Sequence, residues 1–198
     1  FIREEYHAAY QAFRKAKLNK SDSLLKITEK YKQLKADDQV ALSIPQYLDL
    51  LTDMHPLKNG DIFGKLIHYK AYKDLSLDNR IAFSTGVIKL IHGPKSAKGF
   101  TIKFNQKTQH LDLSSYSWLK DINCLQNFPA KSVDLSASSI NNLIGLRVQK
   151  LHRLNISHTK IIELHSLSNK NLKILNISHN AIYNIMPIIT FPIEVIYI

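Results

Sequence analysis

A repeat of about 21 residues in the second half of the chain constrains its fold more than any other feature. The string LNISHTKI begins at Leu154, and the closely similar string LNISHNAI begins at Leu175, 21 positions later. Weaker copies begin at Val133 (VDLSASSI) and Leu111 (LDLSSYSW), and the string IYI begins at Ile196. Self-similarity at a fixed period near 20 residues is typical of chains that stack similar coils. A single coil cannot bury its own apolar side chains, so neighbouring coils must cover them.

Each repeat has two apolar parts with different spacing. The first, Leu-x-Leu or Leu-x-Ile, alternates with polar residues as a short strand does. The second has three apolar residues spaced three apart, which suits a 3₁₀ turn because residues i and i+3 lie on one side. These triplets are Leu119, Ile122 and Leu125; Ile140, Leu143 and Leu146; Ile161, Leu164 and Leu167; and Ile182, Ile185 and Ile188. The repeat therefore predicts parallel strands on the concave side and 3₁₀ segments on the convex side.

The fullest copy of the repeat identifies a family that it resembles. The segment from Leu172 to Ile182 (LKILNISHNAI) matches the pattern L-x-x-L-x-L-x-x-N-x-L at every position. In this pattern residues 108–198 resemble the bacterial leucine-rich repeats of 21–22 residues found in internalin-type proteins. The style of the repeat is also similar to that of repeat regions in larger bacterial receptor-like serine/threonine kinases. The resemblance implies a short leucine-rich-repeat solenoid, with about four repeats and a partial fifth over 108–198, whose function is to recognise another protein.

The asparagine position of the repeat predicts a role in the backbone of the turn. Its side chain can hydrogen-bond amide and carbonyl groups that the turn leaves open. In successive repeats this position holds Tyr116, Ser138, Thr159 and Asn180. Serine and threonine can supply part of that hydrogen bonding, whereas Tyr116 indicates an atypical first repeat.

The segment before the repeats is predicted to be helical. Residues 1–77 are interpreted as a helical domain, with apolar residues at helical spacing over 2–13 and 24–34. Ser43 followed by Pro45 predicts the start of a further helix, and another is expected over about 62–71. The fold class is thus α/β, with an N-terminal helical domain followed by the solenoid.

Residues 78–107 are interpreted as a capping segment, because a solenoid needs a cover over the apolar end of its first repeat. Two structures are compatible with this segment. Asp78 could start a helix that runs to Ile91, or residues 87–91 and 100–104 could form a hairpin. In either case Phe100, Ile102 and Phe104 alternate with polar residues, which favours a strand.

The formal net charge of +11 suggests a second class of partner. Residues 1–107 hold 19 Lys/Arg and 11 Asp/Glu (+8), whereas residues 108–198 hold 8 and 5 (+3). A basic surface can bind nucleic acid or another anionic polymer, and this is the alternative function. Basic residues interspersed with apolar and acidic ones more often form a solvated helix face, so nucleic acid is not the favoured partner.

Neither catalysis nor a cofactor is expected in this chain. A single cysteine, Cys124, excludes an intrachain disulfide and a cysteine-based zinc cluster. The sequence contains no Gly-rich phosphate loop, no G-x-S-x-G and no H-E-x-x-H motif, and we expect no enzyme activity and no metal.

The context of the chain is inferred from its ends and composition. It begins with Phe1 and stops inside a repeat strand at Ile198, so we interpret it as part of a larger bacterial protein, which could carry a kinase domain elsewhere. No signal peptide and no unbroken apolar run of membrane-spanning length is visible. We expect an extracytoplasmic or cell-surface location in preference to a cytoplasmic one.

The concave face supplies the candidate residues for binding another protein or peptide. Extended concave surfaces are where solenoids of this kind usually bind. Projected from the repeat register, the candidates are Asp112, Asp134, Arg153, Asn155, His158, Asn176, His179 and Tyr197.

Two pairs within this set could carry chemistry. His158 and His179 should lie one strand apart, at about 5 Å. Two imidazoles can bind a metal ion, but no third ligand is placed beside them, so we expect two exposed repeat histidines. Asp112 and Asp134 also share a column, and without a pocket or nucleophile we expect an exposed pair and not an acid–base site.

Overall fold

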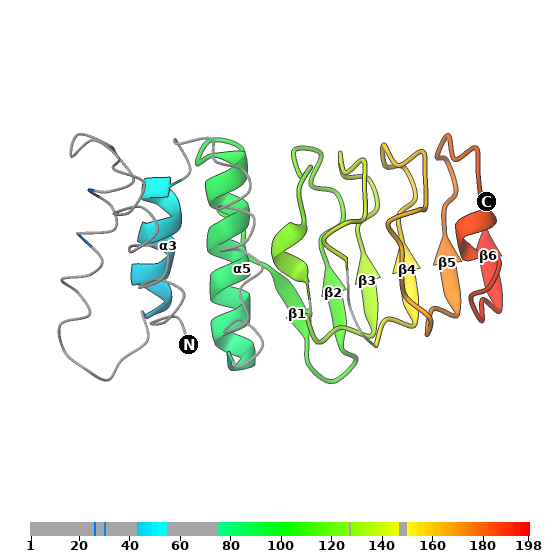
Figure 1. Ribbon diagram of the computed structural model, residues 1–198, viewed down its shortest axis with the longest axis horizontal. Helices are drawn as coiled ribbons and strands as arrows, with labels where there is room; N and C mark the ends of the chain where they lie inside the picture. Colours follow the sequence, from blue (N-terminus) through cyan, green and yellow to red (C-terminus); the bar gives the residue numbers. More distant parts are fainter. Residues whose placement is uncertain (1–25, 27–29, 31–42, 55–74, 127, 147–149) are drawn as a thin grey trace, which may run out of the picture. The chain divides into compact units, whose positions relative to one another are not determined.

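The computed structural model describes residues 26, 30, 43–54, 75–126, 128–146 and 150–198 (Figure 1). The chain divides into two compact units, Phe1–Asn79 and Arg80–Ile198. Apart from Lys26 and Lys30, which are helical, the helices predicted over 2–13, 24–34 and 62–71 lie outside the described residues. Within the described part of the chain, no helix is long and apolar enough to cross a lipid bilayer.

In the first unit, helix α3 (Ile44–Met54) begins where the Ser-x-Pro sequence predicts. The Ser43 hydroxyl accepts a hydrogen bond from the Gln46 backbone N–H at 3.5 Å, and Gln46 Oε1 accepts one from the Ser43 backbone N–H at 2.9 Å. This reciprocal pair is a capping box, which satisfies two amides at the helix start. Leu50 and Leu51 are buried and belong to the apolar face of α3.

Helix α5 (Leu77–His92) resolves the two alternatives for the capping segment in favour of the helix. The Ser76 hydroxyl, and not Asp78, caps it by accepting the Asn79 N–H at 3.3 Å. The hairpin with residues 87–91 is wrong, because Val87 and Ile88 lie on the buried face of this helix. Strand β1 (Lys103–Asn105) instead pairs antiparallel with β2 (His110–Asp112).

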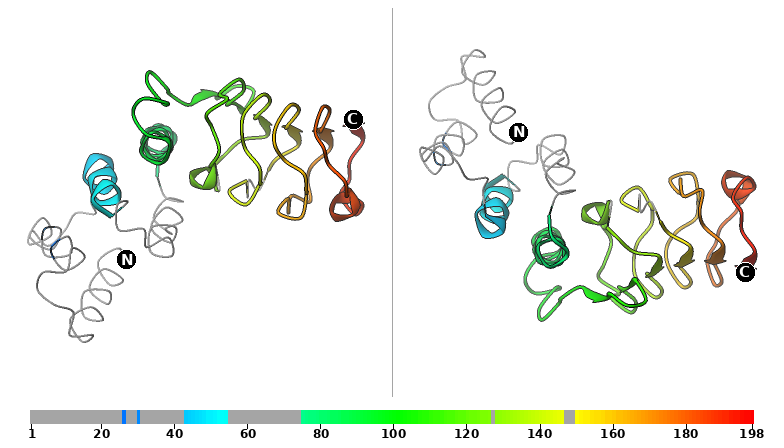
Figure 2. Two further views of the ribbon diagram at one scale, coloured as in Figure 1. Left: turned by 90° about the horizontal axis from the view of Figure 1, so that it is seen from above. Right: turned by 90° about the horizontal axis from the view of Figure 1, so that it is seen from below.

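The solenoid consists of five parallel strands that follow β1 in chain order (Figures 1 and 2). They are β2, β3 (Ser132–Asp134), β4 (Arg153–Asn155), β5 (Ile174–Asn176) and β6 (Val195–Tyr197). The register places Leu111, Val133, Leu154, Leu175 and Ile196 side by side. The register predicted from the repeat is therefore confirmed.

Backbone hydrogen bonds continue from coil to coil just beyond the strands. The N–H of the residue after each strand donates to the last carbonyl of the next strand: Leu113 to Asp134 (2.8 Å), Leu135 to Asn155 (2.8 Å), Ile156 to Asn176 (2.9 Å) and Ile177 to Tyr197 (2.9 Å). These amides would otherwise be buried without a partner. Each coil therefore completes the hydrogen bonding of its predecessor.

The convex side carries one tight turn per coil. The same i to i+3 backbone bond recurs in every coil: Leu125 to Ile122 (2.9 Å), Leu146 to Leu143 (2.9 Å), Leu167 to Leu164 (3.0 Å) and Ile188 to Ile185 (3.1 Å). This is the bond that the triplet spacing predicts. Among the described residues, a 3₁₀ helix forms around this bond at η3 (Asn123–Leu125) and η4 (Met186–Ile188), whereas the described parts of the two middle coils have single turns there.

The interior of the solenoid is made of the repeated apolar positions. Leu154 and Leu143 are fully buried, as are the equivalent residues of the preceding coils. In the last coil Ile185 is 53% exposed and Ile196 is 37% exposed, although the repeat assigns both to the interior. The difference arises because an interior residue is covered by the coil on each side, and the outer face of the last described coil is open.

Side chains at the asparagine position bond the turn as predicted. Asn180 Nδ2 donates to the Ile156 carbonyl oxygen at 2.6 Å, and Asn180 Oδ1 accepts from the Thr159 backbone N–H at 2.8 Å. The Thr159 and Ser138 hydroxyls donate to the carbonyl three residues earlier, of Ile156 and Leu135, at 2.8 and 2.7 Å, and the Thr159 hydroxyl also lies 3.3 Å from Asn180 Oδ1 as a donor. Asn180 therefore joins two coils and includes the Thr159 hydroxyl in the link, whereas the Ser138 hydroxyl bonds within its own coil.

Replacing Asn180 with alanine should reduce the free energy of unfolding of the solenoid by about 2 kcal/mol, because it removes the acceptor of the Thr159 amide and one of the two donors to the Ile156 carbonyl in the preceding coil. Urea denaturation followed by circular dichroism measures the change. The matched control is Asn141→Ala, an exposed residue of an earlier turn whose loss should have an effect within about 0.5 kcal/mol. Equal midpoints for both variants would contradict the bridging role.

Helix α5 contacts the first coil through polar atoms as well as apolar ones. The Ser84 hydroxyl donates to the Cys124 carbonyl at 3.3 Å, and Cys124 Sγ donates to the Ser84 carbonyl at 3.7 Å. His92 Nε2 accepts the Lys120 N–H at 2.9 Å. Burial raises the pKa of the Cys124 thiol, so this cysteine is a packed, unreactive group of the first coil.

Candidate binding surface

The predicted site residues fall into two rows along the solenoid. Four of them, with Tyr197, are the last residues of consecutive strands and are paired in register: Asp112, Asp134, Asn155, Asn176 and Tyr197. We call this the strand-end row. His158 and His179 occupy equivalent positions in the turns that follow β4 and β5. Arg153 begins β4 and lies on the same face as Asn155, since side chains two residues apart in a strand share a face.

In each of four coils, the Asp or Asn side chain of the strand-end row is hydrogen-bonded to the turn that follows its strand. The Oδ1 atom accepts hydrogen bonds from the backbone N–H and the hydroxyl of the serine two residues later. The N–H and hydroxyl distances are 3.0 and 2.7 Å for Asp112 and Ser114, 2.8 and 2.6 Å for Asp134 and Ser136, 3.1 and 2.9 Å for Asn155 and Ser157, and 3.0 and 2.7 Å for Asn176 and Ser178. Such side-chain bonds fix the direction of a turn. These oxygens therefore have a structural role before any partner is considered.

One further bond links the row across coils. Asn155 Nδ2 donates to Asp134 Oδ2 at 3.1 Å, so the polar row is partly satisfied internally. Among the serines that bond the strand-end row, Ser157 is buried, at 6% exposure. The four strand-end Asp and Asn residues are half-buried, whereas Arg153, His158, His179 and Tyr197 are exposed.

The first aspartate of the row, Asp112, has a lowered pKa. Burial alone would raise its pKa, but hydrogen bonds from the Ser114 hydroxyl and amide, with the positive charge of Lys103 and His110 nearby, lower the pKa below its usual value. A carboxyl group with a lowered pKa is ionised at neutral pH and cannot donate a proton. Asp112 is thus a negative charge on the sheet at neutral pH.

The turn after each strand contains a residue in the left-handed region of backbone conformation. The φ angles are 64° at Ser115, 55° at Ala137, 54° at His158 and 58° at His179. Residues other than glycine adopt this region rarely, with histidine, asparagine and aspartate enriched in it. In the last two of these turns the left-handed residue is a histidine, and the two imidazole rings are stacked with centroids 4.1 Å apart and planes inclined by 13°. The sequence predicts this adjacency but not the parallel stacking.

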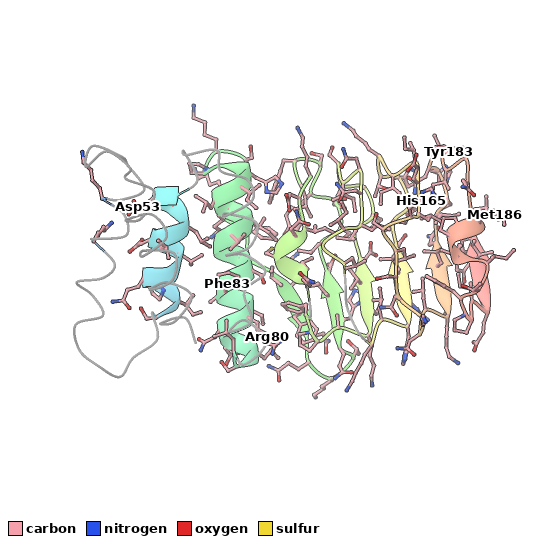
Figure 3. All side chains as sticks on the ribbon, viewed as in Figure 1. Asp53, Arg80, Phe83, His165, Tyr183 and Met186 are labelled. Carbon is pink, nitrogen blue, oxygen red and sulfur yellow. The ribbon has the colours of Figure 1, made fainter. Side chains whose placement is uncertain are left out.

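Exposed apolar side chains on the last coil are a feature that the sequence analysis missed. Tyr183 and Met186, both labelled in Figure 3, are 66% and 64% exposed, and Ile189 is 70% exposed. All three lie outside the apolar triplet of the repeat. The positions of Tyr183 and Met186 hold Ile162 and Ile144 in earlier coils, which are also 49% and 54% exposed.

Comparisons with known proteins leave the family of the chain open. No protein-family model matches it, and no curated protein gives a significant match. Among solved structures, it is similar to a chain from the structure titled "Structure of Chaetomium Mex67:Mtr2 subunits", with 17% sequence identity and a TM-score of 0.35. That similarity covers 51% of this chain and 86% of the other. At this level it transfers neither fold nor function.

Proposed function

We propose that this chain is a protein-binding module, the leucine-rich-repeat recognition or sensor region of a larger bacterial protein that acts outside the cytoplasm. The observation that supports the proposal is the register of the parallel strands, which aligns exposed side chains of successive coils in rows. A row of this kind offers a long, preformed surface for a partner, and preformed surfaces bind at a lower entropic cost.

The residues proposed to contact the partner are those that the fold does not already use. Arg153 and Tyr197 are exposed, Tyr197 at 54%, and arginine and tyrosine are enriched among residues that dominate binding energy. The Asp and Asn residues of the strand-end row are tied to their serines and contribute shape and charge. The partner would therefore bind mainly over β4 to β6.

A matched set of surface variants tests this proposal. Arg153→Glu and Tyr197→Ala should each weaken binding of the partner about 30-fold, the effect of losing a dominant interface residue. Lys160→Glu makes a similar charge change and Tyr183→Ala the same aromatic truncation at exposed positions outside the proposed surface, and both should bind normally. The partner would be recovered with the wild-type chain by chemical cross-linking and then titrated in purified form.

The salt dependence of the same titrations separates the rival function. Binding of an anionic polymer through the basic residues of 1–107 should weaken steeply between low and moderate salt and be indifferent to Arg153→Glu and Tyr197→Ala. A partner with that behaviour, or one lost equally in the control variants, would contradict the proposed protein-binding surface.

A further inference from the structure

We propose that His158 and His179 form a two-histidine binding site for a transition metal ion such as Zn²⁺. Their rings are stacked with centroids 4.1 Å apart and planes inclined by only 13°, and both residues are exposed. Imidazole nitrogen is a preferred ligand of Zn²⁺, Cu²⁺ and Ni²⁺. Two such ligands side by side on a surface can bind one ion together.

The fold holds the two histidines in place. Strands β4 and β5 are paired in register, with Asn155 opposite Asn176, and the backbone N–H of His158 donates to the Ser178 carbonyl at 3.1 Å. The φ angles of the two histidines differ by only 4°, 54° against 58°. The side chains thus leave the backbone in parallel directions from two coils that cannot shift relative to each other without breaking the sheet.

The separation of the rings suits chelation. Two nitrogen ligands at about 2.0–2.1 Å from a tetrahedral Zn²⁺ are about 3.4 Å apart. The rings, with centroids 4.1 Å apart, must rotate out of the stacked arrangement so that the planes of both meet at the ion, and no packed side chain has to move for this because both residues are exposed.

The site would be open. In the described part of the chain, no group of three or more His, Cys, Asp and Glu side chains is placed to hold a metal ion. Water molecules would therefore complete the coordination, so the ion would exchange readily and retain positions for a ligand from another molecule. The sequence alone favours two independent histidines, and the 4.1 Å separation of the two exposed rings is the observation that changes this interpretation.

Zn²⁺ titrations of the untagged full chain by isothermal calorimetry test the proposal. His158→Asn and His179→Asn should each weaken binding of one Zn²⁺ about 100-fold, because loss of one ligand removes the advantage of simultaneous attachment. Asparagine is used because it tolerates the left-handed backbone of both positions. Control variants are His152→Asn, an exposed histidine of the same coil, and His165→Asn, whose imidazole lies 3.3 Å from Glu163; both should bind as the wild type does.

A gain-of-binding variant provides the complementary test. Ala137 is exposed and precedes His158 in the same column, with a φ of 55°. Ala137→His should add a third imidazole and tighten Zn²⁺ binding at least about tenfold. Zn²⁺ binding that is unchanged in His158→Asn and His179→Asn, that is lost equally in the controls, or that Ala137→His fails to tighten would overturn the site.

Discussion

Replacing Gly145 with alanine should destabilise the solenoid by about 3 kcal/mol, because the added methyl group has no space between two coils. A Cβ atom at this position would lie 2.4 Å from the Asn123 Cα and the Ile122 carbonyl oxygen. Both are backbone atoms of the preceding coil, so no side-chain rotation relieves the clash. The coils must separate locally, which weakens the contacts of the neighbouring buried residues. Urea denaturation measures the loss as a lower midpoint at an unchanged slope.

Gly99 provides the control for this substitution. It has a φ of +70°, and a Cβ atom there would meet nothing within 4 Å. Gly99→Ala should therefore cost only the conformational penalty of a left-handed alanine, about 1 kcal/mol. If Gly145→Ala is tolerated as well as Gly99→Ala, the coils are not in the close backbone contact described above.

Leu154→Ala should reduce the free energy of unfolding by about 3–4 kcal/mol, the usual range for a buried leucine whose removal leaves a cavity. Leu154 is fully buried on the central strand β4 and lies between Val133 and Leu175. Its cavity would be lined by apolar residues of the coils on both sides. The loss is measured by the same denaturation experiment.

Ile162→Ala is the matched control for Leu154→Ala. It also truncates an aliphatic side chain in the same coil, but Ile162 is 49% exposed. Its effect should stay within about 0.5 kcal/mol, as for most surface substitutions. Comparable losses for the two variants would show that the interior is not organised around the repeated leucines.

The sequence predicted the strands and their register because two short-range signals agree at each repeat. Apolar residues alternate with polar ones in each strand, and the same alternation returns 21 residues later. A shift of the strand pairing by one residue would therefore expose the whole apolar set. The i to i+3 turn was predictable for the same reason, from the triplet that includes Leu143 and Leu146. Periodicity does not specify how many residues of that turn form a helix, which depends on contacts with the next coil.

The secondary structure of the segment before the repeats could not be predicted uniquely, because its apolar residues are compatible with a helix and with a strand. Residues 87–91 are apolar enough for a strand or for a helix, and only the packing of Val87 and Ile88 decides between them. The alternation of Phe100, Ile102 and Phe104 predicted a strand, of which only the end falls within β1 (Lys103–Asn105), and the pairing of β1 with β2 was not predicted. Pairing depends on the loop that returns the chain, which the pattern of side chains does not encode.

The register that aligns the candidate residues was predicted, but the structural role of the polar ones was not foreseen. Each copy has Asp or Asn two residues before Ser, as in Asp134 and Ser136, and this spacing is a signal for a side-chain-bonded turn. The left-handed backbone conformation of the turn residues was not predicted, because serine, alanine and histidine occupy these positions, whereas glycine or asparagine would have indicated it. The close backbone contact at Gly145 was not predicted either, since a single glycine in a sequence does not indicate which backbone segment approaches it.

Methyl nuclear Overhauser effects in the labelled chain test most directly whether successive coils stack in register. Adjacent parallel strands lie about 4.8 Å apart, so the methyl groups of Leu154 should give strong cross-peaks both to Val133 and to Leu175. Cross-peaks from Leu154 confined to residues of its own repeat would contradict the stacked solenoid on which the binding surface and the histidine pair depend.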